Sequence, residues 1–307
     1  MNKLIATQLD AACNWSDDQR DGLLNAIHER FGDGVQAILI YGSYLRGKRD
    51  TLLDFYVLLE GYPAMKSRWH SMLAWMLSPN VYQVRYEGPA GQARAKYAVM
   101  TTARFEQAMQ GDFHSYFWAR FTQPSGLLYC RDDASREKVI NAIASAARRF
   151  VQTVVPLLPD QFTASDLVSR GLSLTYQCEL RSESKGHAAT LFNHNSDYYR
   201  AVLELNAGHG LGYQKSHQAE IYENQSSARV RKKTSRAWSL RRMQGKLLSL
   251  LRLLKAALTF EDGFDYLIWK ISRHSNIPIE PTKKQLKYPL IFAWPLLWRL
   301  YRQGAFR

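Results

Sequence analysis

Cysteine is scarce in this sequence. The 307 residues contain three cysteines, Cys13, Cys130 and Cys178, at widely separated positions. An odd number with such spacing fits neither a disulfide framework nor a zinc site. We therefore expect reduced thiols and a cytoplasmic protein.

Long apolar runs are missing as well. No window reaches the ~20 apolar residues that a membrane-spanning helix requires. The first residues, Met1 to Ile5, are followed by polar sequence instead of the apolar core of a signal peptide. We therefore expect a protein that is soluble or lies on the inner face of a membrane, without crossing it.

Acidic residues are outnumbered by basic ones. Lys and Arg number 41 against 27 Asp and Glu, which gives a formal net charge of +14. Between Arg229 and Lys255 there are ten basic residues and no acidic one. This balance implies an anionic partner: a nucleotide, a nucleic acid or an acidic membrane surface. Most of the basic run lacks aromatic residues, so it fits phosphate or lipid contact better than base stacking, and we expect no nucleic-acid partner.

What the sequence does contain is a strand, a small-residue turn and a second strand within residues 37–60. The turn is Gly42-Ser43, and Asp54 lies inside the otherwise apolar second strand. A buried charge is costly unless something positive meets it. Glycine lets backbone N–H groups approach a phosphate closely, and the Ser43 hydroxyl adds a donor. This layout is typical of nucleotidyltransferases, in which the turn holds a triphosphate and the acid holds the bridging metal.

The wider pattern predicts an α+β protein with two domains. Strands and helices mix up to residue 131, and the pattern is helical afterwards. We therefore expect a nucleotidyltransferase-like mixed-sheet domain at 1–131 and an all-helical domain at 132–307. The expected strands are 37–41, 52–59, 81–86, 96–100 and 127–130, and the expected helices are 17–31, 65–76, 101–109, 134–155, 164–181 and 196–206. Three glycines in the first half of 207–227 and many polar groups predict a loop there.

A second acid is absent from the second strand. The common superfamily pattern is Asp, an apolar residue and Asp, which places two carboxylates on one face of a strand because strand side chains alternate. Here Tyr56 stands at the second position, and tyrosine is a poor ligand for Mg²⁺. Either catalysis has been lost or a second carboxylate comes from elsewhere. The strand motif by itself leaves both alternatives open.

Four segments in the same order carry a family resemblance. They are Tyr41-Gly42-Ser43 with Leu53-Asp54-Phe55; Lys96-Tyr97-Ala98-Val99; Phe117-Trp118-Ala119-Arg120-Phe121 with Pro124; and Leu157-Leu158-Pro159 with Phe162, Leu167, Leu174, Tyr176, Glu179 and Arg181. From about residue 35 to 205 the chain resembles the mitochondrial-type phosphatidate cytidylyltransferases, the translocator assembly and maintenance family. Tyr44 and the pair Cys178-Glu179 depart from that family's Gly and Gly-Asp.

The resemblance implies a function and a set of site residues. It implies a peripheral membrane enzyme that makes CDP-diacylglycerol from CTP and phosphatidate with Mg²⁺, in a family that also lacks the second strand acid. The implied roles are metal binding by Asp54 and Glu179, charge stabilisation by Lys96 and Arg120, and nucleotide binding by Gly42, Ser43, Tyr44, Arg46 and Lys96.

Each of these side chains also has a plainer interpretation. Lys96 could be a solvated edge lysine, Arg120 a structural arginine stacked on aromatic rings, and Glu179 half of an internal salt bridge. Arg46, Lys48 and Arg49 could belong to a solvated loop. These alternatives stay open at the level of sequence.

The C-terminal part predicts contact with lipid. Residues 247–258 carry a broad leucine face beside a narrow polar one that includes Lys246, Arg252 and Lys255. The tail from Pro289 to Tyr301 is apolar and rich in Trp. Such segments suit an anionic lipid interface, so we expect a membrane-associating tail. The alternative is a helix packed back onto the core.

Three hypotheses follow from the sequence. The first is a Mg²⁺-dependent CTP:phosphatidate cytidylyltransferase on an anionic membrane surface. The second keeps the chemistry but transfers AMP or another nucleotide to a protein, RNA or small molecule. The third is a catalytically inactive basic module that binds membranes or nucleic acid. The sequence leaves the base selectivity and the oligomeric state open.

Overall fold

The computed structural model describes residues 1–11, 18–47, 52–65, 67–89, 91–180 and 187–259, together with residues 282, 295 and 302. Cys13, Lys48, Arg49 and Arg181 lie outside these ranges, and so does the expected tail at 289–301 apart from Pro295. Within the described ranges, no helix has the length and apolar character needed to cross a bilayer.

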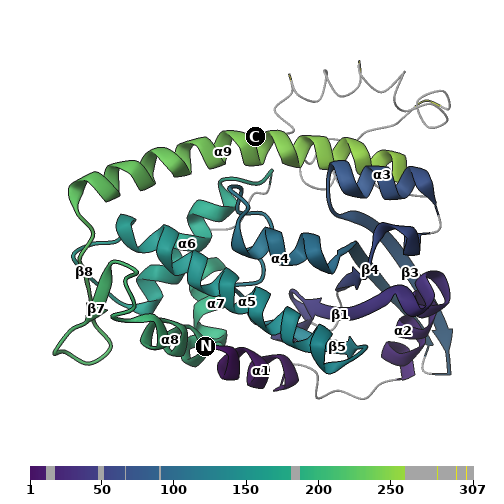
Figure 1. The fold of residues 1–307 in the computed structure, drawn as a ribbon, viewed down its shortest axis with the longest axis horizontal. Coiled ribbons are helices and arrows are strands. Elements are labelled where there is room, and N and C mark those ends of the chain that lie inside the picture. Colours follow the sequence, from purple (N-terminus) through teal and green to yellow (C-terminus); the bar gives the residue numbers. More distant parts are fainter. Residues whose placement is uncertain are drawn as a thin grey trace.

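In this part of the chain, five strands form a mixed sheet in the order β3-β4-β2-β1-β5 (Figure 1). β2 runs parallel to β4, and the other neighbouring pairs are antiparallel. The strands are β1 (Val35–Tyr41), β2 (Leu53–Leu59), β3 (Asn80–Gly88), β4 (Gly91–Thr101) and β5 (Gly126–Cys130). All five were predicted from the sequence, but β4 begins earlier than expected because it pairs with β3 as a long hairpin.

The alternation of side chains along each strand divides the interior into two apolar clusters. In β2, Phe55 and Val57 enter one cluster, while Tyr56 and Leu58 enter the other. The first cluster lies under α2 and α3, and the second lies under α1, α4 and α5. Since side chains two residues apart share a face, Asp54 lies on the same side of the sheet as Tyr56.

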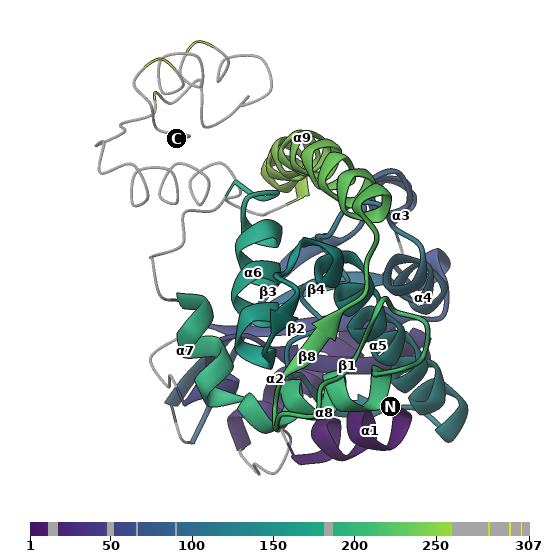
Figure 2. The same ribbon diagram turned by 90° about the vertical axis from the view of Figure 1, so that its left-hand side faces the viewer.

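Helices cover both faces of the sheet (Figures 1 and 2). Their bounds are α1 (Asn2–Ala11), α2 (Asp18–Phe31), α3 (Arg68–Met76), α4 (Thr102–Gln110), α5 (Asp133–Val154), α6 (Ala164–Tyr176), α7 (His187–His194), α8 (Ser196–Asn206) and α9 (Ala228–Thr259). Neither α1 nor α7 was predicted from the sequence, and the sequence-based bounds extended the helix that begins at residue 164 to residue 181, whereas α6 ends at Tyr176.

Side-chain caps explain where three of the helices begin. Thr101 Oγ1 accepts a hydrogen bond from the backbone N–H of Arg104 at 3.2 Å at the start of α4. Asp132 does the same for Ser135 at the start of α5, at 2.7 Å. α6 opens with a reciprocal capping box between Thr163 and Asp166. Such caps satisfy N–H groups that the helix leaves without partners, and each contributes about 1 kcal/mol.

The expectation of an all-helical second half was wrong. A small sheet with the strand order β6-β8-β7 follows α5, built from β6 (Gln161–Phe162), β7 (Tyr213–Lys215) and β8 (Tyr222–Asn224). Two of its strands lie in the segment predicted as a loop. The glycines around Tyr213 led to the prediction of a loop. The strand pairing could not be predicted locally, because the apolar contacts that support it come from a distant strand. Phe162 lies 5.8 Å, centroid to centroid, from the rings of both Tyr213 and Tyr222.

The basic run forms a single long helix, α9, which crosses the molecule over α6 and reaches α3 (Figures 1 and 2). The burial of its side chains shows which side of the helix faces the protein. Trp238, Arg241 and Lys255 are buried, with 2%, 6% and 7% of their surface exposed, whereas Leu247 is 58% exposed. The helix therefore turns part of its polar side toward the protein and much of its leucine face outward.

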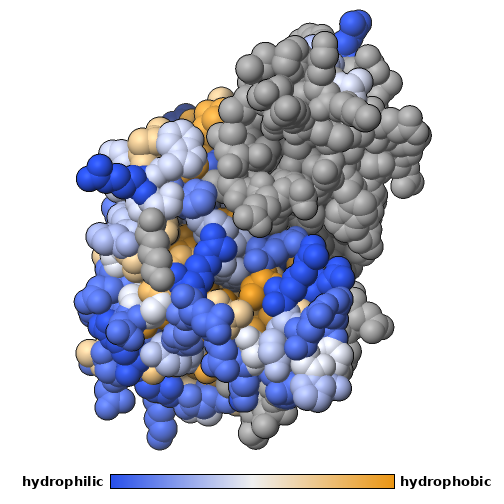
Figure 3. All heavy atoms as spheres, turned by 90° about the vertical axis from the view of Figure 1, so that its right-hand side faces the viewer, coloured by the Kyte–Doolittle hydropathy of each residue, from blue (hydrophilic) through white to orange (hydrophobic). Residues whose placement is uncertain are grey.

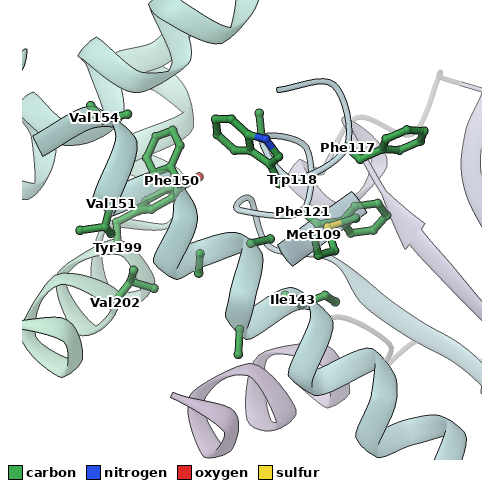
Figure 4. Packing of buried hydrophobic residues seen from close by; sticks show 14 of the residues in the cluster. Met109, Phe117, Trp118, Phe121, Ile143, Phe150, Val151, Val154, Tyr199 and Val202 are labelled. Carbon is green, nitrogen blue, oxygen red and sulfur yellow. The ribbon is translucent and has the colours of Figure 1, made fainter. Parts of the chain in front are cut away.

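One apolar cluster crosses the boundary predicted at residue 131. It joins residues of β1 and β2 with residues of α5, α6, α8 and α9. Figure 4 shows α5 in its middle, with Phe150 and Val151 near Tyr199 on one side and Phe121 beyond Ile143 on the other. The sheet and the helical part are thus packed directly against each other.

Candidate active site

Asp54 lies at the start of β2, between a turn and a lysine. Its register partners are Tyr41 in β1 and Lys96 in β4. Lys96 Nζ is 3.9 Å from Asp54 Oδ1, and each side chain is 29% exposed. The pair is therefore partly open to solvent, which limits its contribution to stability and leaves the carboxylate accessible to a ligand.

Gly42 allows the turn to approach this carboxylate. Its φ is +95°, a conformation that residues with side chains rarely adopt. A Cβ built there would lie 3.2 Å from Asp54 Oδ2, which is closer than an ordinary van der Waals contact. The structure thus brings Gly42, Asp54 and Lys96 together.

After Gly42 the chain turns away from the Asp54 carboxylate. Ser43 leads into a 3₁₀ turn at Tyr44–Arg46, which Gly47 ends with a φ of +83°. Tyr44 packs against the apolar cluster under α2 and α3, on the face of the sheet opposite Asp54. Its ring therefore does not narrow the turn on the side of the carboxylate, although the sequence had placed Tyr44 among the nucleotide-binding residues.

A pocket of about 250 Å³ opens beside the turn. It is lined by residues from α1, the turn, the segment before β5 and α8: Gln8, Ala11, Gly42, Leu45, Arg46, Gln123, Pro124, Asn195 and Tyr198. The hydroxyl of Tyr198 is buried and has no hydrogen-bond partner. The pocket thus combines the glycine turn and one arginine with amide groups and an unpartnered hydroxyl.

Tyr56 has a structural partner in place of a metal. Arg120 Nη1 donates to the Tyr56 hydroxyl at 3.0 Å. The Arg120 guanidinium also lies 4.4 Å from the ring centroid of Tyr116 and 5.4 Å from that of Tyr41. Burial alone would lower the pKa of Arg120, but Tyr116, Tyr56, Tyr41 and the carboxylate of Glu179 together raise it. Arg120 is therefore a permanent cation on the face of the sheet that carries Asp54.

Glu179 lies just beyond α6, where its backbone N–H donates to the carbonyl of Tyr176 at 3.0 Å. Its half-buried carboxylate acts on Tyr116 and Arg120, and also on Arg252 of α9. The structure therefore brings Glu179 to the arginines rather than into an acid cluster. No group of three or more His, Cys, Asp or Glu side chains suited to a metal occurs among the described residues.

The donor set nevertheless suits Mg²⁺ in one respect. Mg²⁺ commonly takes one or two carboxylates, keeps several waters and binds phosphate oxygens of the substrate. Asp54 supplies one accessible carboxylate beside a turn that can hold phosphate. That chemistry fits a metal delivered together with a nucleotide better than a metal held by the protein alone.

Two residues of this region were missed by reasoning from the sequence. Tyr116 precedes the motif that contains Arg120, and Arg252 was assigned to a polar stripe on the last helix. Arg252 reaches the cluster only because α9 folds back over the molecule, which no local spacing signals. No family model and no curated protein matches this chain.

Proposed function

We propose that this protein is a Mg²⁺-dependent nucleotidyltransferase that transfers CMP from CTP to phosphatidate, in keeping with the resemblance noted above. The observation that carries the proposal is the apposition of Asp54, Gly42 and Lys96 at one end of the central strands of a mixed sheet. The arrangement supplies an accessible carboxylate, a turn with positive φ and a cation within a few ångströms of each other.

In the proposed reaction, an oxygen of the acceptor phosphate attacks the α-phosphorus of CTP. The bond between that phosphorus and the oxygen bridging to the β-phosphate breaks, and its electron pair leaves with pyrophosphate. The acceptor phosphate is already ionised at neutral pH, so no strong general base is required. A single strand carboxylate is therefore less of an obstacle here than in an enzyme that must deprotonate a hydroxyl.

The residues have distinct roles in this scheme. Asp54 would hold Mg²⁺, which would neutralise phosphate charge and align the triphosphate. Backbone N–H groups after Gly42 and the Ser43 hydroxyl would hold the β- and γ-phosphates. Lys96 and Arg120 would stabilise charge that develops on the phosphates. The pocket beside the turn, with its amides from Gln123 and Asn195, would take the base and ribose.

A peripheral membrane location is part of the proposal. α3 lies beside α9 (Figures 1 and 2). Large apolar side chains with more than 40% of their surface exposed occur on α3 and, between residues 240 and 251, on α9: Trp69, Met72, Trp75, Met76, Leu240, Met243, Leu247, Leu250 and Leu251. We call these nine residues the α3–α9 face. The end of the molecule that carries α3 is seen in Figure 3, where white and orange residues lie near the top and blue ones dominate below.

Charge favours an anionic lipid interface as the occupant of the α3–α9 face. α9 has exposed cations at Lys232, Lys233, Arg236, Arg242 and Lys246 and no acidic residue. An apolar face flanked by basic residues binds anionic membranes through buried apolar area together with electrostatic attraction. Phosphatidate is itself an anionic lipid, so this surface would bring the enzyme to its substrate.

The proposal is tested with purified protein, labelled CTP, phosphatidate vesicles and Mg²⁺. We expect labelled CDP-lipid from the wild type and a loss of at least about 100-fold in Asp54→Asn, which removes the charge and keeps the shape. Glu137→Gln is the matched control, because it removes an exposed carboxylate on α5. The assignment fails if the wild type makes no labelled lipid or if Asp54→Asn retains full activity.

A second candidate is a catalytically inactive basic module that binds anionic membranes. The observation in its favour is that Tyr56, at the position of the second acid, is bound to Arg120. It predicts no Mg²⁺-dependent stabilisation by CTP or ATP in thermal unfolding, and vesicle binding that persists in Asp54→Asn. Stabilisation by ATP in place of CTP would instead indicate another nucleotidyltransferase.

A further inference from the structure

α9 is anchored to the turn between α3 and β3 by two cations. Arg252 Nε donates to the carbonyl of Ser78 at 3.1 Å. Lys255 Nζ donates to the carbonyl of Pro79 at 2.6 Å and to Asn80 Oδ1 at 3.0 Å, and it also contacts the carbonyl of Leu77. These bonds hold Arg252 in place on the protein.

From this anchor, Arg252 meets Arg120 at one aromatic ring. The Arg252 guanidinium lies 4.0 Å from the ring centroid of Tyr116, and that of Arg120 lies 4.4 Å from the same centroid. Both arginines and Tyr116 are half-buried. Burial lowers the pKa of Arg252, and the charge of Arg120 contributes in the same direction, because two like charges repel each other unless an anion compensates them.

Within the described part of the chain, the carboxylate that acts on both guanidiniums is that of Glu179, so two cations there share one anion. Arg252 Nη1 is also buried and has no hydrogen-bond partner. A buried donor without a partner costs about 1–3 kcal/mol or more when it is charged, which a ligand oxygen would recover.

We propose that Arg120 and Arg252 together form a phosphate-binding site beside Tyr116, whose ligand is a phosphate oxyanion. The planar guanidinium fork matches phosphate oxygens, and such charge-assisted bonds are among the stronger hydrogen bonds in proteins. Arg252 is thereby a ligand-binding residue contributed by α9.

The site adjoins the Asp54 carboxylate. Arg120 lies 5.4 Å from the ring centroid of Tyr41, and Tyr41 is the register partner of Asp54. The inference rests on the proposed function only for the identity of the phosphate. That phosphate belongs either to the lipid acceptor or to the nucleotide, and both present the same chemistry to two guanidiniums.

Binding of inorganic phosphate, measured by calorimetry at low ionic strength without Mg²⁺ or CTP, tests the site directly. We expect Arg252→Gln to weaken phosphate binding by at least about tenfold, since charged hydrogen bonds are lost. Arg148→Gln is the matched control, because it removes an exposed arginine on α5, outside both the site and α9. Equal phosphate affinity in Arg252→Gln and wild type would overturn the proposal.

Because Arg252 also anchors α9, a second variant is needed to distinguish loss of the phosphate site from loss of the fold. Arg252→Lys keeps the cation but loses the fork, and we expect phosphate affinity several-fold below the wild type with an unchanged far-ultraviolet dichroism spectrum. Should Arg252→Gln fail to fold, wild-type affinity in Arg252→Lys would refute the site.

Two further arms identify the source of the phosphate. One measures CTP binding without acceptor, and the other compares vesicles containing phosphatidate with vesicles containing phosphatidylglycerol. If Arg252→Gln weakens only the binding of CTP, the site holds a phosphate of the nucleotide. If it weakens only the binding of phosphatidate vesicles, the site holds the phosphate of the acceptor. Because inorganic phosphate binding requires no turnover, a protein that makes no CDP-lipid but loses phosphate binding in Arg252→Gln would retain this site without the proposed function.

Discussion

At the scale of single residues, the environment of Tyr116 differs from that of the other buried tyrosines. Burial raises the pKa of Tyr116, but Arg120 and Arg252 lower it by more, so that its pKa lies below the ordinary value. Tyr97 shows the opposite balance, because burial raises its pKa to about 12 despite its contact with Arg30. At Tyr116 the two guanidiniums outweigh burial, whereas at Tyr97 burial outweighs Arg30.

We therefore expect Tyr116 to be among the first tyrosines to ionise as the pH rises. A titration of phenolate absorbance should show an early step that is missing in Tyr116→Phe and moves to higher pH in Arg252→Gln. In Arg236→Gln the step should stay where it is in the wild type. An unchanged early step in Tyr116→Phe would show that another tyrosine is responsible.

The sign of the effect on stability follows from the direction of the shift. A folded-state pKa below the unfolded value of about 10 means that the phenolate stabilises the folded state. That contribution is fully present above the unfolded pKa and is lost as the pH falls through the folded pKa. Relative to Tyr116→Phe, the wild type should thus gain stability only at alkaline pH.

At the scale of elements, α9 completes the cluster formed by Arg120, Tyr116 and Glu179, because it contributes Arg252. Its close approach to the end of α6 requires Gly245, since a Cβ there would clash with the backbone carbonyl of Cys178. The next residue after Cys178 is Glu179, whose carboxylate acts on both arginines. A single small residue on α9 thus controls the distance between the helix and the cluster.

Gly245→Ala tests this packing because two effects oppose each other. Helix propensity alone would stabilise the alanine variant by about 1 kcal/mol. A clash with backbone costs typically about 1–3 kcal/mol, so we expect a net loss of stability in chemical unfolding, accompanied by weaker phosphate binding. Ser235→Ala, at an exposed position on the same helix, should leave both unchanged. A stabilised Gly245→Ala would show that α9 does not need this contact.

The orientation of α9 also separates two uses of its basic residues. Arg241, Arg252 and Lys255 face the protein, where they donate to carbonyl oxygens of Phe113, of Ser78 and of Leu77 and Pro79, respectively. The exposed cations remain available to an outside partner. The same run of ten basic residues therefore serves both for internal attachment and for external charge.

At the scale of the whole molecule, the proposed phosphate chemistry and the α3–α9 face are linked through α9. One side of the helix carries Arg252 to the cluster, and the other exposes Met243 and Leu247. A helix that lies on a membrane would thus place a phosphate-binding residue next to the lipid surface.

Replacing Trp75 with Ala and Leu247 with Ser together should weaken binding to anionic vesicles by about tenfold or more, because each buried apolar side chain contributes roughly 1.5–3 kcal/mol. Co-sedimentation with vesicles measures this. Leu205→Ser is the matched control, since Leu205 is 45% exposed on α8 and lies outside the α3–α9 face. Equal losses in both proteins, or none in the double variant, would contradict a docking role for the face.

Turnover of a soluble short-chain phosphatidate separates docking from chemistry. The double variant should process it as the wild type does, while losing activity on vesicles. Loss on both substrates would place the defect in the site rather than in the α3–α9 face.

The sequence by itself indicated the five strands of the first 131 residues and most of the helices there, α1 excepted, together with the turn at Gly42 and the acid at Asp54. The meeting of Gly42 with Asp54 is local, because the turn directly follows β1, the strand beside β2. Lys96 joins them through the parallel pairing of β2 with β4, which the sequence left open. Alternation along β2 then decides which side of the sheet the carboxylate faces.

Only the tertiary structure decided the second sheet, the outward leucines of α9 and the pairing of Arg252 with Arg120. Arg252 and its partner Ser78 lie 174 residues apart. The leucine face by itself left lipid contact and packing onto the core both open, and hydrogen bonds to the turn at 77–80 and the close contact at Gly245 turn part of it outward. Contacts between such distant residues depend on how the folded helices and strands pack against each other. Local sequence patterns do not specify that packing.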